Sequence, residues 1–150
     1  VTWSRQVVTD GRVDAVVLVG GKGTRLRPLT LSAPKPMLPT AGVPFLTHLL
    51  SRIAATGIEH VVLGTSYRAE TFEQEFGDGS KLGLQISYVT EEQPLGTGGG
   101  IANVAERLRN DTVMVFNGEG QSLTNNVLTL TKDVMPAPVR DSGIYVFALP

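Results

Sequence analysis

The chain has 150 residues, and 13 lysines and arginines against 14 aspartates and glutamates give it a formal net charge of −1. That balance argues against a nucleic-acid-binding protein that works through overall positive charge, and the absence of cysteine excludes a disulfide scaffold, a thiolate metal site and a cysteine nucleophile. Apolar residues make up 41 %, which is enough for the core of one domain and excludes a disordered chain.

Strand and helix patterns alternate from residue 13 onward, after residues 1–12, which show no period and are expected to form a flexible tail. Short β-branched or alternating runs predict strands over residues 13–19, 58–63, 84–89 and 112–116. Apolar residues at helical spacing predict helices over residues 44–56, 69–76 and 99–108. The alternation predicts one α/β domain over residues 13–150 with a mainly parallel sheet. Two further strands are expected at residues 127–130 and 143–147.

The sequence contains no pattern of a membrane or export segment. Its longest strongly apolar run, residues 15–19, is far shorter than the roughly 20 residues that cross a bilayer. The first residues lead into no signal-peptide core. We therefore expect a cytoplasmic protein with no membrane partner.

Three glycine- or acid-containing loops follow three of the predicted strands. They are residues 20–27, 90–98 and 117–120. Because ligands bind beyond the carboxyl ends of the strands in open parallel sheets, we expect these loops to line one edge of the sheet and to form a site there.

The loop at residues 20–27 combines glycines with cations. No acidic residue occurs between Asp14 and Glu59, a stretch that contains Lys22, Arg25, Arg27, Lys35 and Arg52. Glycines leave backbone N–H groups free to surround anionic oxygens, and arginine and lysine neutralise the charge, so a polyphosphate fits this loop. The alternative is a tight turn with solvated basic residues. Gly23 stands where a Walker loop needs serine or threonine, and Leu26 where the dinucleotide fingerprint needs glycine, which excludes both of those loops.

The same stretch carries a family resemblance. Residues 18–30 read LVGGKGTRLRPLT, and residues 34–39 read PKPMLP. This pattern resembles the signature of the sugar-1-phosphate nucleotidyltransferases, and within them it is similar to the mannose-1-phosphate guanylyltransferases. The similarity extends over about residues 13–119. It implies a Rossmann-like, three-layer nucleotidyltransferase fold, and transfer of a guanylyl group from GTP to mannose-1-phosphate, which gives GDP-mannose and pyrophosphate.

The resemblance also implies roles for individual residues. Arg25 and Lys35 would be catalytic contacts of the phosphates. Nucleotide-binding residues would be Gly20, Gly21, Gly23, Thr24, Gln93, Gly96 and Thr97. Sugar-binding residues would be Asn117, Gly118 and Asp141, and Glu119 would be the ligand of a Mg²⁺ cofactor.

The chain departs from the family at two places. Glu119 follows Asn117-Gly118 where the family has aspartate, and the added methylene moves the carboxylate by about 1 Å from where an octahedral Mg²⁺ needs it. Residues 141–147 resemble a sugar-holding segment that lies much farther along in the family, so the fold is expected to be incomplete, with an internal deletion and no C-terminal portion.

Two other functions stay open at this point. A nucleotide- or nucleotide-sugar-binding module without catalysis would keep the phosphate loop and lose the metal and sugar residues, as this sequence does. A sister enzyme that transfers a thymidylyl or adenylyl group to glucose-1-phosphate shares the same loop. Association into a homo-oligomer is common in the family and is also left open.

Overall fold

The computed structural model describes residues 13–118 and the strand at residues 127–131. A five-stranded sheet in the order β5-β4-β1-β6-β7 forms its centre. The four parallel strands are β1 (Val13–Leu18), β4 (His60–Thr65), β5 (Gln85–Thr90) and β6 (Thr112–Asn117). β7 (Val127–Thr131) pairs antiparallel with β6. A separate ribbon pairs β2 (Pro39–Thr40) with β3 (Val43–Pro44).

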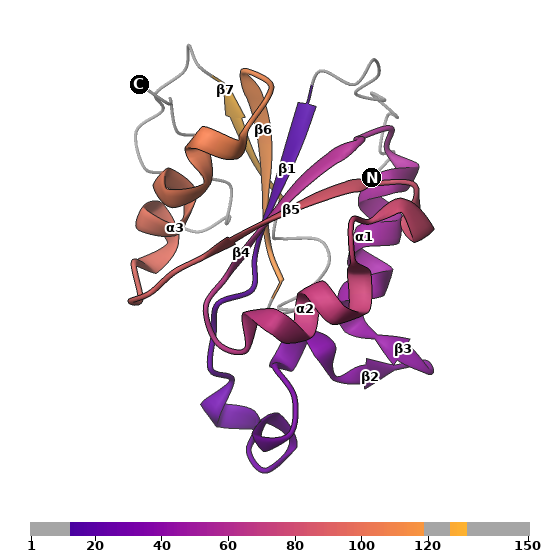
Figure 1. Ribbon diagram of the computed structural model, residues 1–150, viewed down its shortest axis with the longest axis vertical. Coiled ribbons are helices and arrows are strands. Elements are labelled where there is room, and N and C mark those ends of the chain that lie inside the picture. The colour runs from indigo at the N-terminus through magenta and orange to yellow at the C-terminus, as the bar shows by residue number, and fades with distance from the viewer. Residues whose placement is uncertain (1–12, 119–126, 132–150) are drawn as a thin grey trace, which may run out of the picture.

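Helices cover both faces of the sheet, as Figure 1 shows. α1 (Phe45–Ala55) and α2 (Ala69–Phe76) lie on one side, and α3 (Gly96–Val104) lies on the other. Short 3-10 turns occupy Thr24–Leu26, Leu29–Leu31, Lys35–Met37, Ser80–Leu82 and Ala105–Arg107. The arrangement is the three-layer α/β fold with a mainly parallel sheet that the sequence predicts. None of the described helices is long and apolar enough to cross a lipid bilayer.

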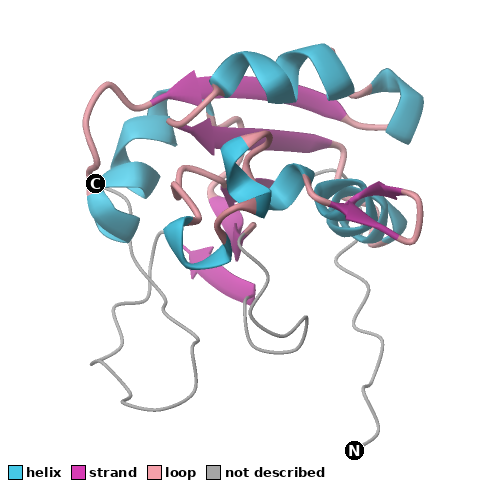
Figure 2. Cartoon of the chain, turned by 90° about the horizontal axis from the view of Figure 1, so that it is seen from below, coloured by secondary structure: helices cyan, strands magenta, loops and turns pink. Residues whose placement is uncertain are grey.

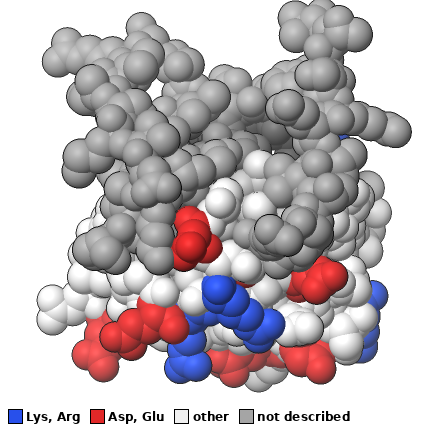
Figure 3. Space-filling model, turned by 90° about the horizontal axis from the view of Figure 1, so that it is seen from above, with Lys and Arg blue, Asp and Glu red and all other residues white. Residues whose placement is uncertain are grey.

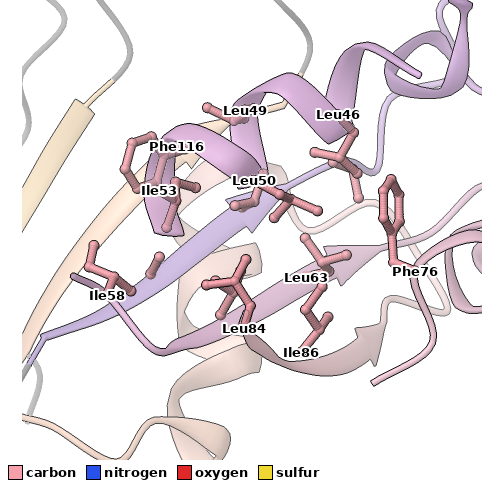
Figure 4. Close-up of a cluster of buried hydrophobic side chains, with 14 of the residues drawn as sticks. Leu46, Leu49, Leu50, Ile53, Ile58, Leu63, Phe76, Leu84, Ile86 and Phe116 are labelled. Carbon is pink, nitrogen blue, oxygen red and sulfur yellow. The ribbon is translucent and has the colours of Figure 1, made fainter. Parts of the chain in front are cut away.

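The core of the larger layer forms between α1 and the sheet (Figure 4). Leu46, Leu49, Leu50 and Ile53 recur at helical spacing, so they fall on one face of α1 and are buried. Alternate residues of the strands meet them, among them Leu63. Truncating a side chain as buried as Leu50 would cost about 2–5 kcal/mol. This packing fixes the sheet, and the sheet in turn fixes where its loops begin.

Asp14 connects three segments at the end of the sheet where β1 and β6 begin. Its fully buried carboxylate accepts hydrogen bonds from the ring of His60 (3.1 Å), the backbone N–H groups of Arg109 and Asn110, and the side-chain amide of Asn110 (3.0 Å). Burial by itself raises the pKa of Asp14, but the bonds from His60, Arg109 and Asn110 outweigh it and hold that pKa below its ordinary value. The network ties the start of β6 to β1 and β4.

The structure corrects two details of the expected elements and adds a third. The strand expected at residues 58–63 is β4 at His60–Thr65. The strand expected at residues 127–130 is present as β7, and its antiparallel pairing is a detail that the sequence left open. The helix expected at residues 99–108 begins at Gly96 and ends at Val104. Glycine's low helix propensity favoured the later start, but a Cβ at Gly99 would lie 2.7 Å from Leu95 Cβ, so close packing decides the residue type there. Residues 1–12 and 143–147 lie outside the described part of the chain.

Candidate functional site

Residues 20–38, here called the glycine loop, leave the carboxyl end of β1 and fold back on themselves. Gly23 has a φ of +59°, in the left-handed region that favours glycine. A Cβ at Gly23 would lie 2.9 Å from Thr30 Cγ2 and 3.3 Å from Lys35 Cβ. The Thr30 hydroxyl donates to the Gly23 carbonyl at 2.8 Å. The loop therefore places Lys35 beside Gly23, although the two are 12 positions apart in the sequence.

In the part of the chain that the structure describes, the first turn of the glycine loop has backbone N–H groups without a backbone acceptor. Among the described residues, no backbone carbonyl accepts a hydrogen bond from the N–H groups of Gly21 through Arg25. The side chains of Lys22, Thr24 and Arg25 are exposed, and that of Lys35 is half-buried. Successive N–H groups without an acceptor, with cations near them, are the kind of arrangement that binds anions. The first turn thus has groups that would suit a polyphosphate.

The charge pattern distinguishes this end of the molecule from the opposite one. Figure 2 looks at the molecule from the end where the glycine loop lies. No acidic residue occurs from residue 15 to residue 58, so the loop carries cations alone. Figure 3 views the opposite end, where acidic and basic side chains lie side by side in the described part of the surface. The loop itself therefore attracts anions, while Glu91 and Glu92 follow the carboxyl end of β5 at the same edge of the sheet.

Asn117 and Gly118 lie beside the start of the glycine loop. Asn117 is opposite Leu18 in the β1–β6 pair, and the Gly118 N–H donates to the Leu18 carbonyl at 2.9 Å. A Cβ at Gly118 would lie 2.4 Å from Val19 Cγ1, so glycine is required for this approach. The structure thus brings the first and third predicted loops together, as the sheet topology implied.

The second predicted loop is joined to this edge through α3. Gln93, Gly96 and Thr97 are exposed, and Gly96, with a φ of +69°, turns the chain into the helix. A Cβ at Gly100 would lie 2.7 Å from Glu91 Oε1 and 3.4 Å from Leu18 Cδ2. Gly100 therefore serves the packing of α3 against the sheet. Gln93, Gly96 and Thr97 face open solvent at the same edge.

The metal and sugar carboxylates are not placed by the structure. Glu119 and Asp141 lie outside the described residues. Within the described ranges, no three histidine, cysteine, aspartate or glutamate side chains gather as metal ligands. The Mg²⁺ ligand that the resemblance implies, Glu119, therefore stays a prediction.

Two further residues hold the glycine loop and were missed by the sequence analysis. The Ser66 hydroxyl donates to the Gly20 carbonyl, and the Arg68 guanidinium donates to the carbonyls of Leu31 and Ser32. Both lie in the connection from β4 to α2. β4 is parallel to β1, so the rule that picks out loops at carboxyl ends applied to this connection as well. This connection contains no cluster of glycines or acids, so the sequence pattern did not single it out.

Comparisons with known proteins show a family match and similar sequences. The nucleotidyl transferase family matches residues 14–133. A mannose-1-phosphate guanylyltransferase of Mycobacterium tuberculosis is 85 % identical over 108 residues, which are 72 % of this chain and 30 % of that protein. The mannose-1-phosphate guanylyltransferase catalytic subunit beta of Xenopus tropicalis is 43 % identical over 108 residues, 70 % of this chain and 30 % of that protein. The chain thus spans about 30 % of the length of these curated relatives.

Solved structures show the same fold. The crystal structure of HddC from Yersinia pseudotuberculosis complexed with GMP-PN has a TM-score of 0.63 at 33 % identity, and the match covers 70 % of this chain and 47 % of that one. A Bacillus anthracis protein, solved as a glucose-1-phosphate thymidylyltransferase in complex with a sucrose, has a TM-score of 0.66 at 22 % identity. That match covers 71 % of this chain and 44 % of the other, and it supports the fold alone.

Proposed function

Because this chain belongs to the nucleotidyl transferase family, we propose that it serves the transfer of a guanylyl group from GTP to mannose-1-phosphate. The chain matches about 30 % of the length of its curated relatives, so the proposal concerns the nucleotide-binding part of the reaction first. The observation that carries it is the glycine loop, where the N–H groups of Gly21 through Arg25 have no backbone acceptor among the described residues and Lys35 is folded against Gly23.

The proposed chemistry is an in-line displacement at the α-phosphorus. A phosphate oxygen of the sugar-1-phosphate forms a bond to that phosphorus, the bond to the bridging oxygen of the β-phosphate breaks, and pyrophosphate leaves with the electron pair. Two anions must approach each other, so positioning and charge neutralisation are the main tasks of the protein.

Four groups of the glycine loop would carry out these tasks. Backbone N–H groups and the Thr24 hydroxyl would hold the triphosphate. Arg25, which is exposed at the first turn, would neutralise charge that develops on the leaving pyrophosphate. Lys35 would contact the phosphates from the other side, as its place beside Gly23 allows. Asn117 and Gly118, next to the start of the loop, would face the sugar.

Guanine and mannose are the finer part of the proposal. Both curated relatives named above are mannose-1-phosphate guanylyltransferases, and the HddC structure carries GMP-PN. A thymidylyl or adenylyl transferase acting on glucose-1-phosphate is the alternative, and binding measured with four nucleoside triphosphates in parallel separates them. A Mg²⁺ cofactor, a cytoplasmic location and a homo-oligomer stay predictions.

The test compares Arg25→Ala with Arg107→Ala, a control that removes the same charge from an exposed turn outside the site. If Arg25 stabilises the transition state, Arg25→Ala lowers kcat on the order of 10²-fold while GTP affinity changes little. Equal losses in kcat and affinity would contradict that role. Arg107→Ala should leave both unchanged.

Glu119→Asp separates the enzyme from a binding module without catalysis. The shorter carboxylate is the one that the resembling family uses, so an enzyme with a misplaced ligand should gain turnover. A wild-type chain that binds GTP, and a variant that still shows no turnover, would favour the binding module.

A further inference from the structure

We propose that Arg68 is a positioning residue, which holds the far end of the glycine loop through two backbone carbonyls and so sets the phosphate contacts before a nucleotide arrives. The effect on turnover rests on the proposed function, whereas the effect on the loop does not. The inference follows from the contacts of Arg68, its backbone conformation and the exposure of Leu29 and Leu31 in the loop.

The guanidinium of Arg68 bridges the last part of the exposed loop. Its Nη1 donates to the Ser32 carbonyl at 2.6 Å, and its Nη2 donates to the Leu31 carbonyl at 3.2 Å. The centre of the guanidinium lies 5.5 Å from the centroid of the Tyr67 ring, within the range of a cation–π contact. A planar fork with two donors suits two neighbouring carbonyls, and a lysine ammonium cannot reproduce it. Two of its five N–H donors are thus engaged with the loop backbone.

The backbone of Arg68 indicates that its side chain is what the position requires. Arg68 has φ 55° and ψ 48°, the left-handed conformation, immediately before α2. Among the described residues, only Ala41 and Arg68 adopt a positive φ without being glycine. Glycine or asparagine would adopt this conformation at lower cost. An arginine held there is explained by the two hydrogen bonds that it makes.

Hydrogen bonds position the part of the loop around Leu31: the Thr30 hydroxyl donates to the Gly23 carbonyl at 2.8 Å, and Arg68 holds the two following carbonyls. Leu29 and Leu31 are 61 % and 56 % exposed, so apolar burial does not anchor this part. Short 3-10 turns contribute little order of their own. The Ser66 hydroxyl donates to the Gly20 carbonyl at the start of the loop. Ser66 and Arg68, two residues apart on one connection, therefore hold residues 20 and 31–32, on either side of the first turn with Thr24 and Arg25.

Hydrogen exchange of backbone amides in the full chain, without nucleotide, tests the restraint directly. Arg68→Lys keeps the charge and the backbone cost but loses the fork, and Arg68→Asn removes the side chain while tolerating the left-handed conformation. Both should raise exchange about tenfold at the hydrogen-bonded amides of Leu26, Arg27 and Leu31, with α1 and β4 unchanged. Arg107→Asn, at an exposed position outside the site, should change neither region. Wild-type exchange at these three amides in both Arg68 variants would overturn the proposal.

Kinetics test whether the restraint serves the reaction. Both Arg68 variants should lose on the order of 10²-fold in kcat/KM, because a small misplacement of positioned groups has that effect. A wild-type kcat/KM in Arg68→Lys would show that the charge alone matters, and it would overturn the proposed positioning role of Arg68. Faster exchange with unchanged kcat/KM would reduce the contact to a structural one and also overturn it. A wild-type chain that binds no triphosphate would contradict the proposed function, and the exchange comparison would still decide the restraint.

Discussion

Replacing Gly23 by alanine perturbs the glycine loop at the point where it folds back. Two costs follow from the structure. An alanine at φ +59° costs roughly 1–2 kcal/mol. Its Cβ would also lie 2.9 Å from Thr30 Cγ2, so Thr30 must shift and weaken its hydrogen bond to the Gly23 carbonyl, which is worth about 1 kcal/mol. We expect a loss of about 2–3 kcal/mol in the free energy of unfolding.

Gly83→Ala is a matched control. Gly83 has the same left-handed conformation, φ 71° and ψ 24°, but a Cβ there meets nothing within 4 Å. It should cost the same roughly 1–2 kcal/mol of backbone penalty, a fall of about 3–6 °C in Tm, whereas Gly23→Ala should lower Tm by about 3 °C more. The two variants therefore share the backbone penalty and differ in the contact with Thr30.

Nucleotide affinity separates the two variants more sharply. Gly23→Ala should weaken GTP binding at least about tenfold, the equivalent of one lost hydrogen bond to a charged group, and Gly83→Ala should leave it unchanged. Isothermal titration calorimetry of the two variants and the wild type measures this. Equal GTP affinity in all three proteins would refute the placement of the phosphates at the glycine loop.

Three other substitutions test the phosphate contact, the approach of two strands and the buried carboxylate. Lys35→Ala should weaken GTP binding, most strongly at low salt because salt screens the lost charge; unchanged affinity at low salt would count against the phosphate contact. Gly118→Ala should destabilise the chain by at least about 2 kcal/mol, because its Cβ would lie 2.4 Å from Val19 Cγ1; a wild-type Tm would show that the strands can separate freely there. Since folding lowers the pKa of Asp14, its stabilising contribution is present above about pH 4 and is lost as the pH falls through the folded-state pKa. Asp14→Asn should therefore reduce the free energy of unfolding at pH 7 by about 3 kcal/mol. In this variant the free energy of unfolding should also decrease less as the pH is lowered, which urea titrations from pH 2 to pH 7 would measure.

The layers and the sheet were predictable because local patterns agreed with the tertiary packing. β-branched runs gave the strands, and the residues of α1 that the spacing placed on one face are the ones buried in the structure. The limits of α3 were not predictable, since Gly99 and Gly100 contradict helix propensity. A Cβ at Gly99 would lie 2.7 Å from Leu95 Cβ, a close contact within the helix start that helix propensity does not take into account.

The candidate site was predictable where a sequence motif marks it. The glycine loop and Gly118 lie together at one edge of the sheet, as the order of loops and strands indicated. Ser66 and Arg68 were not predictable from their types, because a serine and an arginine without a motif are ordinary surface residues. Their contacts with the glycine loop are hydrogen bonds between residues 36 to 46 positions apart, which only the structure shows.

A thermal melt of the full chain with and without GTP and Mg²⁺ shows whether the glycine loop binds a nucleotide. A ligand that binds only the folded state adds about 2.7 kcal/mol at 100 times its dissociation constant, so Tm should rise by several degrees with GTP and less with the other triphosphates. Gly23→Ala should reduce that rise, and Gly83→Ala should keep it. A cooperative melt whose midpoint no triphosphate moves would contradict the glycine loop as a nucleotide site.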